Sequence, residues 1–364
     1  MKKKFTDEEI KKIWQYYSDF ATNTALFPLL KIKRHRTSNS FTHVCNVTRN
    51  AIEYAIKHSL DIDYFSLIRG GFLHDYYFYD WRDNKKLLWG HGRKHPLIAL
   101  QNAIRDFNIN DKEKDIIKNH MWPLGLFRFP KSKEARIISY MDKKSATVDA
   151  LSLRHKAIIF DFDGTLFDTV TDVTNSLNLA FKENGIKPIT VEQMKPRMGY
   201  VMVDTIKYFL GEDASEELVN KVIKDYRKYY DDHFATNVQP YEDIKETLIR
   251  LKARGYRLGV STNKKEEAAK FILDKFFPNL IDCVQGDDGK IPLKPNPTCI
   301  KRVKKRLRSR KIVYVGDTEI DYQTARNAKA PVIIATYGYR DKKDLAKLDA
   351  IKIDKPSELL IYLK

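Results

Sequence analysis

The sequence predicts a multidomain protein in which an all-helical N-terminal domain is followed by an α/β domain with a second helical segment inserted into it. Three observations lead to this prediction. Histidines and aspartates recur on helix-like segments within residues 1–150, whereas apolar runs that end in polar residues occur throughout 155–364. The stretch from about 172 to 238, between the first two of those runs, has helical periodicity. At 364 residues the chain is long enough for two or three separate cores.

The N-terminal domain is expected to begin with a helix at Thr6 and Glu9, which have the spacing of a capping box. Its most informative residues are spaced histidines and aspartates that lie on or beside helix-like segments: His43, His74, Asp75, His95, His120 and Asp142. Imidazoles and carboxylates that converge in a helical bundle favour a first-row transition metal over Mg²⁺, which prefers oxygen ligands. The segment HGRKH offers either His91 or His95 as a ligand, and we favour His95 because it immediately precedes the helix-like LIALQNAI.

The order of these residues, with the adjacent His-Asp pair, resembles the HD superfamily of metal-dependent phosphohydrolases over roughly residues 30 to 150. The resemblance implies two metal ions, chosen from Mn²⁺, Fe²⁺, Co²⁺, Ni²⁺ and Zn²⁺, that clamp a bridging hydroxide for attack on phosphorus. One ion would be held by His43, His74, Asp75 and Asp142. The other would be held by His95 and His120, with Asp75 as the bridge. A single metal, or an intact fold without activity, are the alternatives.

The C-terminal domain is expected to begin with KAIIFDFDGTLFDT at residues 156–169. Its apolar run, residues 157–160, is typical of a strand buried on both faces in a parallel sheet. Asp161 and Asp163 leave that strand on one side because side chains alternate, and Gly164 permits the turn that follows. Two carboxylates at one point are costly unless a cation lies between them, so the motif predicts a Mg²⁺ site with one carboxylate free to attack an electrophile.

Two more strands and one lysine are expected to complete this site. YRLGVST, at 256–262, ends in hydroxyl groups and is followed by Asn263. IVYVGDTEID, at 312–321, ends in Asp317 and Asp321, and Lys294 lies between the two strands in LKPNP. Ligands gather beyond the carboxyl ends of parallel strands, so we expect these segments to converge.

In this order the four segments resemble the haloacid dehalogenase (HAD) superfamily of phosphotransferases, over roughly residues 155 to 364. The resemblance implies a Rossmann-like α/β core in which Asp161 forms an aspartyl-phosphate. Asp163 would protonate the leaving oxygen and then activate water. Mg²⁺ would be held by Asp161, by the main-chain carbonyl of Asp163 and by Asp317, with Asp321 as a supporting partner.

The same resemblance implies how the phosphoryl group is bound. Thr262 and Asn263 would donate hydrogen bonds to it, Lys294 would offset its charge, and Gly164 would let the backbone approach. The inserted segment resembles the helical cap of the phosphoglycolate-phosphatase branch, which would exclude water and choose the substrate. Arg197, in KPRMG, is the expected cap contact to the substrate, with a solvated surface arginine as the alternative.

Composition sets broader limits. The formal charge of +18 would attract phosphorylated metabolites, nucleotides and nucleic acid alike, and nucleic acid is the less favoured partner. The densest run of basic residues, 301–311, is expected to lie on a helix. Three scattered cysteines favour a reducing cytoplasm. No apolar tract is long enough to cross a membrane, and the first ten residues do not form a secretory signal. The oligomeric state stays open.

Together these observations predict a bifunctional phosphohydrolase. The HAD-like domain would hydrolyse small phosphate monoesters, phosphoglycolate-like or nucleotide, and the HD-like domain would be a metal-dependent phosphoesterase. Two alternatives remain: the HD-like domain is a nucleotide-sensing regulatory module, or the protein processes nucleic-acid termini.

Overall fold

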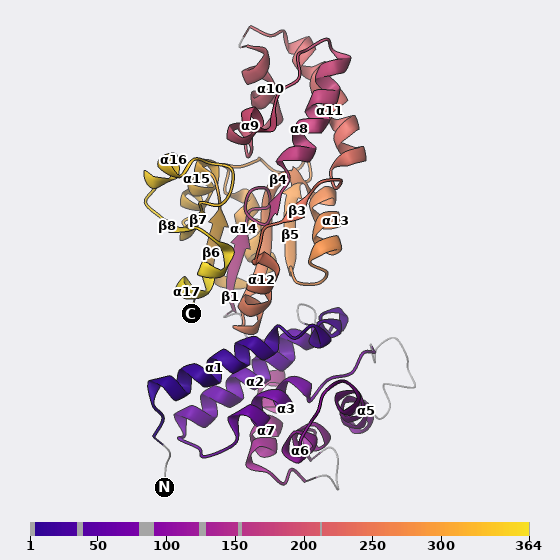
Figure 1. The fold of residues 1–364 in the computed structure, drawn as a ribbon, viewed down its shortest axis with the longest axis vertical. Helices are drawn as coiled ribbons and strands as arrows, with labels where there is room; N and C mark the ends of the chain where they lie inside the picture. The colour runs from indigo at the N-terminus through magenta and orange to yellow at the C-terminus, as the bar shows by residue number, and fades with distance from the viewer. Residues whose placement is uncertain are drawn as a thin grey trace. The chain divides into compact units, whose positions relative to one another are not determined.

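The computed structural model describes residues 4–34, 39–79, 91–123, 129–151, 155–211 and 213–363. The chain divides into two compact units (Figure 1). One comprises Met1–Leu153 with Ile249–Tyr256, and the other comprises Arg154–Leu248 with Arg257–Lys364. In the described residues, no helix combines the length and the apolar character needed to span a bilayer.

The first unit is built from helices, and its first helix begins at the predicted capping box, which the structure confirms. The side chain of Thr6 accepts from the backbone of Glu9, and the Glu9 carboxylate accepts from the backbone of Thr6. The helices of this unit are α1 (Asp7–Ala21), η1 (Thr24–Lys31), α2 (Ser40–Lys57), α3 (Tyr64–Leu73), α5 (His91–Asp106), α6 (Asp111–Asn119) and α7 (Lys133–Leu151).

Two glycines let helix α3 pack closely against its neighbours. A Cβ atom at Gly71 would collide with the Thr48 side chain of α2, and one at Gly70 would collide with Ile116 of α6. Both helices therefore approach the backbone of α3, and the fully buried residues at these contacts form part of the core. The histidines and aspartates described below lie at one end of each of α2, α3, α5 and α6 and on one face of α7.

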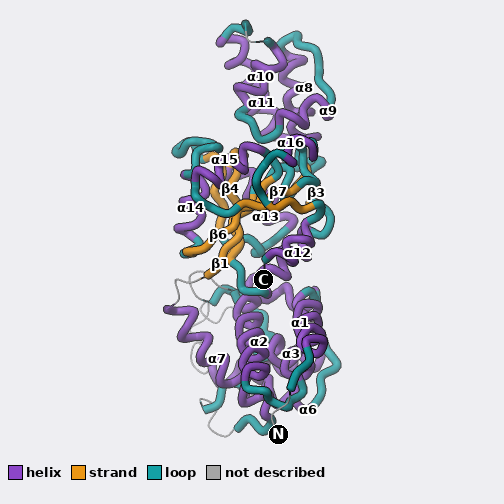
Figure 2. Tube along the Cα trace, turned by 90° about the vertical axis from the view of Figure 1, so that its left-hand side faces the viewer, coloured by secondary structure: helices purple, strands orange, loops and turns teal. Residues whose placement is uncertain are grey.

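The second unit contains a six-stranded parallel sheet in the order β5-β4-β1-β6-β7-β8. Helices flank the strands (Figure 2). The strands are β1 (His155–Phe160), β4 (Arg257–Lys265), β5 (Cys283–Asp287), β6 (Ser309–Gly316), β7 (Val332–Ala335) and β8 (Ile351–Ile353). Its helices outside the inserted segment include α13 (Glu266–Phe276), α14 (Thr298–Arg306), α15 (Glu319–Asn327), α16 (Lys342–Ala346), η3 (Pro356–Glu358) and α17 (Leu359–Tyr362). Helix α12 (Ile244–Ala253) begins in this unit, and its residues from Ile249 onward are grouped with the first.

The register of the central strands explains why the site forms at one edge of the sheet. Phe160, the last residue of β1, pairs with Val260 of β4 and with Val315 of β6. The polar residues that follow these three positions therefore leave the sheet at the same level. Residues 157–160 are at most 1% exposed, as expected for a strand covered on both faces.

A helical cap is inserted between β1 and β4 of the core. It comprises α8 (Val170–Glu183), α9 (Val191–Met194), η2 (Lys195–Arg197), α10 (Met202–Leu210) and α11 (Glu216–His233). Its own apolar core includes Leu177, Phe181 and Val222. Two short strands, β2 (Phe167–Asp168) and β3 (Gln239–Pro240), pair antiparallel where the chain enters and leaves the cap.

Candidate active site and metal centre

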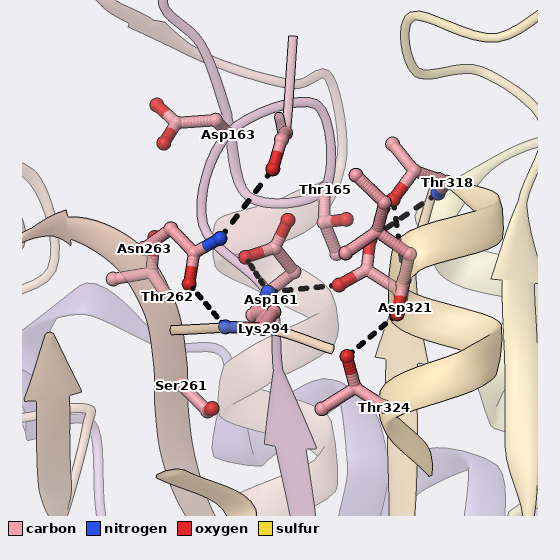
Figure 3. A network of polar contacts seen from close by, with 12 residues as sticks. Asp161, Asp163, Thr165, Ser261, Thr262, Asn263, Lys294, Thr318, Asp321 and Thr324 are labelled. Carbon is pink, nitrogen blue, oxygen red and sulfur yellow. Dashed lines mark hydrogen bonds and ion pairs between the residues drawn. The ribbon is translucent and has the colours of Figure 1, made fainter. Parts of the chain in front are cut away.

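Asp161 and Lys294 form the buried centre of the candidate active site (Figure 3). The Asp161 backbone donates to the Val315 carbonyl at 2.8 Å, which fixes the residue beyond β1. Lys294 Nζ donates to Asp161 Oδ1 at 2.5 Å and to Asp321 Oδ1 at 2.8 Å. Burial, and then the nearby Asp321 carboxylate, raise the pKa of Asp161. Burial alone would lower the pKa of Lys294, but the two carboxylates outweigh it and hold the pKa above its ordinary value, so the ammonium stays charged.

Three buried carboxylates lie close enough to bind one cation. Asp161, Asp317 and Asp321 each offer an oxygen within 4.8 Å of the others. Burial and the charge of Asp321 raise the pKa of Asp317 to about 7. The Lys294 ammonium pairs with Asp161 and Asp321 of this set, and a divalent cation with a preference for oxygen ligands fits the remaining excess of negative charge.

Asp321 is already held by donors from the protein. In addition to Lys294, the Tyr314 hydroxyl donates to Oδ1 at 3.0 Å, and the Thr318 hydroxyl donates to Oδ2 at 2.7 Å. Burial would raise the pKa of Asp321, but Lys294 and these hydrogen bonds lower it below its ordinary value. This carboxylate therefore remains ionised, and its many protein donors suit it to orienting Lys294.

The turn after β1 fits against Asp317. Gly164 has a φ of +80°, and a Cβ atom at this position would collide with the Asp317 carboxylate. Thr165 Oγ1 donates to Asp317 Oδ1 at 3.1 Å, and the backbone of Tyr339 donates to Oδ2 at 2.9 Å. Our sequence reasoning missed both Thr165 and Tyr339. Thr165 directly follows Asp-Gly in the first motif, which was an available signal, whereas nothing in the sequence marked Tyr339.

The carboxylate of Asp163 is turned away from that of Asp161 (Figure 3). Its Oδ1 atom accepts from Thr169 Oγ1 at 2.5 Å and forms an ion pair with Lys264 Nζ at 2.9 Å. The Asp163 carboxylate must therefore turn before it can approach that of Asp161. Neither Thr169 nor Lys264 received a role from the sequence.

The residues after β4 lie beside this centre, and they also reach the cap. Thr262 is buried, and its hydroxyl accepts from the Lys264 backbone at 3.1 Å. The Asn263 side chain accepts from the Lys294 backbone at 2.8 Å and donates to the Gly199 carbonyl of the cap at 3.4 Å. The structure thus brings together the predicted core residues at the carboxyl edge of the sheet.

Arg197 has a different environment from the other predicted site residues. Its guanidinium carbon lies 4.2 Å from the ring centroid of Tyr200 and 4.5 Å from that of Tyr208. It also donates to the Asp204 carbonyl at 3.4 Å. These partners all belong to the cap, so the contacts given by the structure place Arg197 in a stack of cap side chains, two residues from the Gly199 carbonyl that reaches Asn263.

The parallel sheet, the paired Asp161 and Lys294 at its carboxyl edge, and the inserted helical cap define a class of capped α/β hydrolases. The model of the family "Haloacid dehalogenase-like hydrolase" matches residues 158–335. A phosphoglycolate phosphatase of Aliivibrio fischeri is 32% identical over 193 residues, which cover 50% of this chain and 85% of the relative. The chain belongs to the haloacid dehalogenase-like hydrolase family.

Further similarities lie within the same family. A phosphoglycolate phosphatase of Aquifex aeolicus is 29% identical over 208 residues, which cover 56% of this chain and 95% of that relative. The crystal structure of a predicted phosphoglycolate phosphatase from Haemophilus somnus has a TM-score of 0.51 and 26% identity. That comparison covers 59% of this chain and 100% of the other. The C-terminal unit is therefore similar to phosphoglycolate phosphatases along nearly their full length.

The helical unit gathers the predicted histidines and aspartates into two adjacent groups. The first consists of His43, His74 and Asp142, and the second of Asp75, His95 and His120. Asp75 faces both groups with different oxygens. Its Oδ2 lies 3.6 Å from His43 Nε2 and 3.4 Å from His74 Nε2, whereas its Oδ1 lies 3.2 Å from His95 Nε2 and 3.6 Å from His120 Nε2.

The histidine rings are oriented as metal ligands would be. Main-chain carbonyls lie 2.6–2.8 Å from the Nδ1 atoms of His74, His95 and His120, so Nδ1 carries the proton and each Nε2 has a free lone pair. Burial lowers the pKa of His74 to about 3 and that of His95 to about 4, and it lowers the pKa of His120 well below its ordinary value. These rings are therefore neutral, which is the form that binds metals.

Two observations show that a cation fits between these rings. The Nε2 atoms of His95 and His120 lie 2.9 Å apart, although neither carries a proton in the arrangement above. Within the described part of the chain, the buried Nε2 of His74 has no hydrogen-bond partner. A transition metal would accept these lone pairs, and neutral imidazoles with carboxylates are its usual ligands.

His95, rather than His91, belongs to the second group. The Nδ1 atom of His91 lies 3.2 Å from the Tyr79 hydroxyl, and the ring stacks on His95 with centroids 4.6 Å apart. The structure also adds a residue that the sequence did not indicate: the guanidinium of Arg34 contacts Oδ2 of Asp75. A positive charge thus already lies at the carboxylate that faces both groups.

Proposed function

We propose that the C-terminal unit hydrolyses small phosphate monoesters through an aspartyl-phosphate on Asp161. The observation that carries this proposal is the buried Lys294, which pairs with Asp161 and Asp321 beside Asp317. Phosphoryl transfer depends mainly on positioning and on positive charge around the transferring group, and this cluster offers both next to a nucleophile. The names of the similar proteins support phosphoglycolate or a related monoester as the substrate.

In the first half of the reaction, a carboxylate oxygen of Asp161 attacks phosphorus while the bond to the leaving oxygen breaks. Asp163 turns toward the leaving oxygen and gives it a proton. In the second half, Asp163 takes a proton from water as that water attacks phosphorus. The bond between phosphorus and Asp161 then breaks, and inorganic phosphate leaves.

Mg²⁺ fits this site, with Asp161, Asp317 and the main-chain carbonyl of Asp163 as the residues that would hold it. When bound, it would neutralise the charge that develops on the phosphoryl oxygens. Lys294 keeps the Asp161 carboxylate in place, and Thr262 and Asn263 bind the phosphoryl oxygens. The cap excludes water from the closed site.

Asp161→Asn tests this proposal because it keeps the shape of the nucleophile and removes its charge. A panel of phosphorylated metabolites, with Mg²⁺ present, should give turnover for the wild type and at least about a thousandfold less for the variant. Asp349→Asn, at an exposed aspartate, is the control and should keep full turnover. Undiminished turnover by Asp161→Asn would show that Asp161 is not the nucleophile.

We further propose that the helical unit is a second, metal-dependent phosphoesterase of the HD type. The observation in favour is Asp75, whose two oxygens face two separate groups of metal-binding side chains. Two ions held in this way could position water for in-line attack on phosphorus. The free thiols of Cys45, Cys283 and Cys299 support a reducing compartment such as the cytoplasm for both activities.

Metal analysis separates the helical site from the Asp161 site. After reconstitution with Mn²⁺ or Zn²⁺, His74→Ala should lose bound metal, whereas His58→Ala, at an exposed histidine, and Asp161→Asn should retain it. Any phosphoesterase activity that survives in Asp161→Asn should disappear on Asp75→Ala. If the wild type bound none of these ions, the metal centre would be refuted. If it bound them but cleaved no phosphoester, a nucleotide sensor would be the better assignment.

A further inference from the structure

Lys264 is a second buried lysine in the active site, and the reaction above gives it no role. It directly follows Asn263, and its side chain is only 4% exposed. Its Nζ atom lies 2.9 Å from Asp163 Oδ1 and donates to the hydroxyl of Tyr230 on cap helix α11. The ammonium also lies 5.0 Å from the ring centroid of Tyr230 and 5.5 Å from that of Phe162.

These contacts place Lys264 at the leaving-group end of the site. Asp163 turns from Lys264 toward the leaving oxygen when it delivers its proton, so Lys264 lies within the reach of that one side chain from the leaving group and can meet a charged group that extends beyond the leaving oxygen. Lys294, by contrast, pairs with the nucleophile Asp161 and serves the phosphoryl end. The two lysines thus divide the site, with one ammonium at each end of the bond that breaks.

The surroundings of Lys264 favour an anion. The Lys264 ammonium is 4% exposed and lies between the Asp163 carboxylate and the rings of Tyr230 and Phe162. A buried cation among aromatic rings has little water to replace a lost partner. When Asp163 turns away to act on the leaving oxygen, Lys264 therefore needs another negative group.

We propose that Lys264 selects monoesters whose leaving group carries a negative charge of its own, such as a carboxylate. The inference rests on the phosphatase function proposed above. The anionic group of the substrate replaces Asp163 as the ion-pair partner of Lys264, and Asp163 is then free to turn toward the leaving oxygen. A neutral leaving group leaves the Lys264–Asp163 pair intact, so the acid stays turned away. The cap takes part in this selection, because the Tyr230 hydroxyl on helix α11 accepts a hydrogen bond from the Lys264 ammonium.

Two esters of similar size test the proposal: 2-phosphoglycolate, whose leaving group has a carboxylate, and ethyl phosphate, whose leaving group is neutral. The measurement is the ratio of their kcat/KM values, because any effect on Asp163 that both substrates share cancels in the ratio. The full-length wild type should prefer 2-phosphoglycolate at least about tenfold. Lys264→Met should bring the ratio close to one, and Lys264→Arg, which keeps the charge, should restore most of the preference.

A matched pair of cap variants checks the part played by Tyr230. Tyr230→Phe should reduce the preference, because the ammonium loses the hydroxyl that holds it. Tyr226→Phe should leave the preference unchanged, since that ring stacks on Tyr230 one turn away without contacting Lys264 among the interactions described. If Lys264→Met does not fold, the wild-type ratio and the two tyrosine variants still decide the matter.

The outcomes separate this inference from the function on which it rests. Equal hydrolysis of both esters by the wild type, or a preference that persists in Lys264→Met, would overturn the role of Lys264 and leave the phosphatase assignment intact. Hydrolysis of neither ester, nor of any other monoester, would refute the phosphatase function and this inference with it.

Discussion

Replacing Lys294 by methionine should destabilise the metal-free protein strongly. The lysine side chain is 4% exposed and lies 2.5 Å and 2.8 Å from two carboxylates that are also buried. Removing one partner of a buried ion pair costs about 3–5 kcal/mol, because the remaining charge keeps its desolvation penalty. Uptake of a proton by Asp161, whose pKa is already raised, keeps the cost within that range. For a unit of this size each kcal/mol shifts Tm by about 2–4 °C, so we expect a decrease of about 6–20 °C.

Thermal unfolding in EDTA, and again in Mg²⁺, measures this effect. The difference should shrink in Mg²⁺, because a divalent cation replaces the missing positive charge. Lys265→Met is the matched control: it removes a lysine 2.8 Å from Asp231, but that side chain is 50% exposed, and such pairs contribute at most about 1 kcal/mol. A decrease for Lys294→Met no larger than that for Lys265→Met would contradict the assignment of Lys294 as the buried counter-charge.

Three other perturbations test neighbouring parts of the second unit. Gly164→Ala should lower Mg²⁺-dependent turnover at least about tenfold, because its Cβ displaces the Asp317 carboxylate. The control is Gly185→Ala, which has open space at a similar φ and should cost only about 1 kcal/mol of stability. Equal turnover by both variants would argue against this packing. Urea unfolding in EDTA should show that the contribution of Asp317 to the free energy of unfolding falls as pH rises from about 4 to about 7. The reason is that the native carboxyl keeps a proton that the unfolded chain has lost. Mg²⁺ should reverse this trend. A stability that rises over this window in EDTA and is insensitive to Asp317→Asn would count against the raised pKa. Asp172→Ala should destabilise the cap by about 1–3 kcal/mol, because the Asp172 carboxylate accepts hydrogen bonds from the backbones of Asn237 and Val238. Native proteolysis near residue 237 should become faster in the variant. An unchanged cleavage rate would mean that these hydrogen bonds do not stabilise the cap.

The parts of the fold that sequence could predict are those encoded by local pattern. The apolar run at 157–160 indicated a strand covered on both faces, and its end fixed the direction of Asp161. Gly185, with a φ of +67°, lies just after the end of the first cap helix, which is where a glycine in a sequence commonly indicates a helix end. Because the carboxyl ends of parallel strands share one edge, the convergence of Asp317, which directly follows β6, with Asp161 also followed from topology.

The features that sequence could not predict depend on side chains from distant segments. Lys264, Thr169 and Tyr339 have no motif of their own, and their roles follow from rotamers set by packing. The basic run expected on one helix instead leaves α14 after Arg306 and continues into β6 at Ser309, with Arg308 at a φ of +49°. No glycine or proline marks that break, and a run of like charges carries no information about where a helix stops.

The pairing of β2 with β3 has a consequence for how this architecture can diversify. Phe167 pairs with Pro240 and Asp168 with Gln239, so the two ends of the cap leave the core side by side. An insertion with adjacent ends can be lengthened, shortened or exchanged without changing the distance that the core must span. Grafting a cap of foreign sequence between Asp168 and Gln239 should therefore leave the parallel sheet and the Asp161 centre able to fold, and substrate preference could evolve in this lineage by recombination as well as by point substitution.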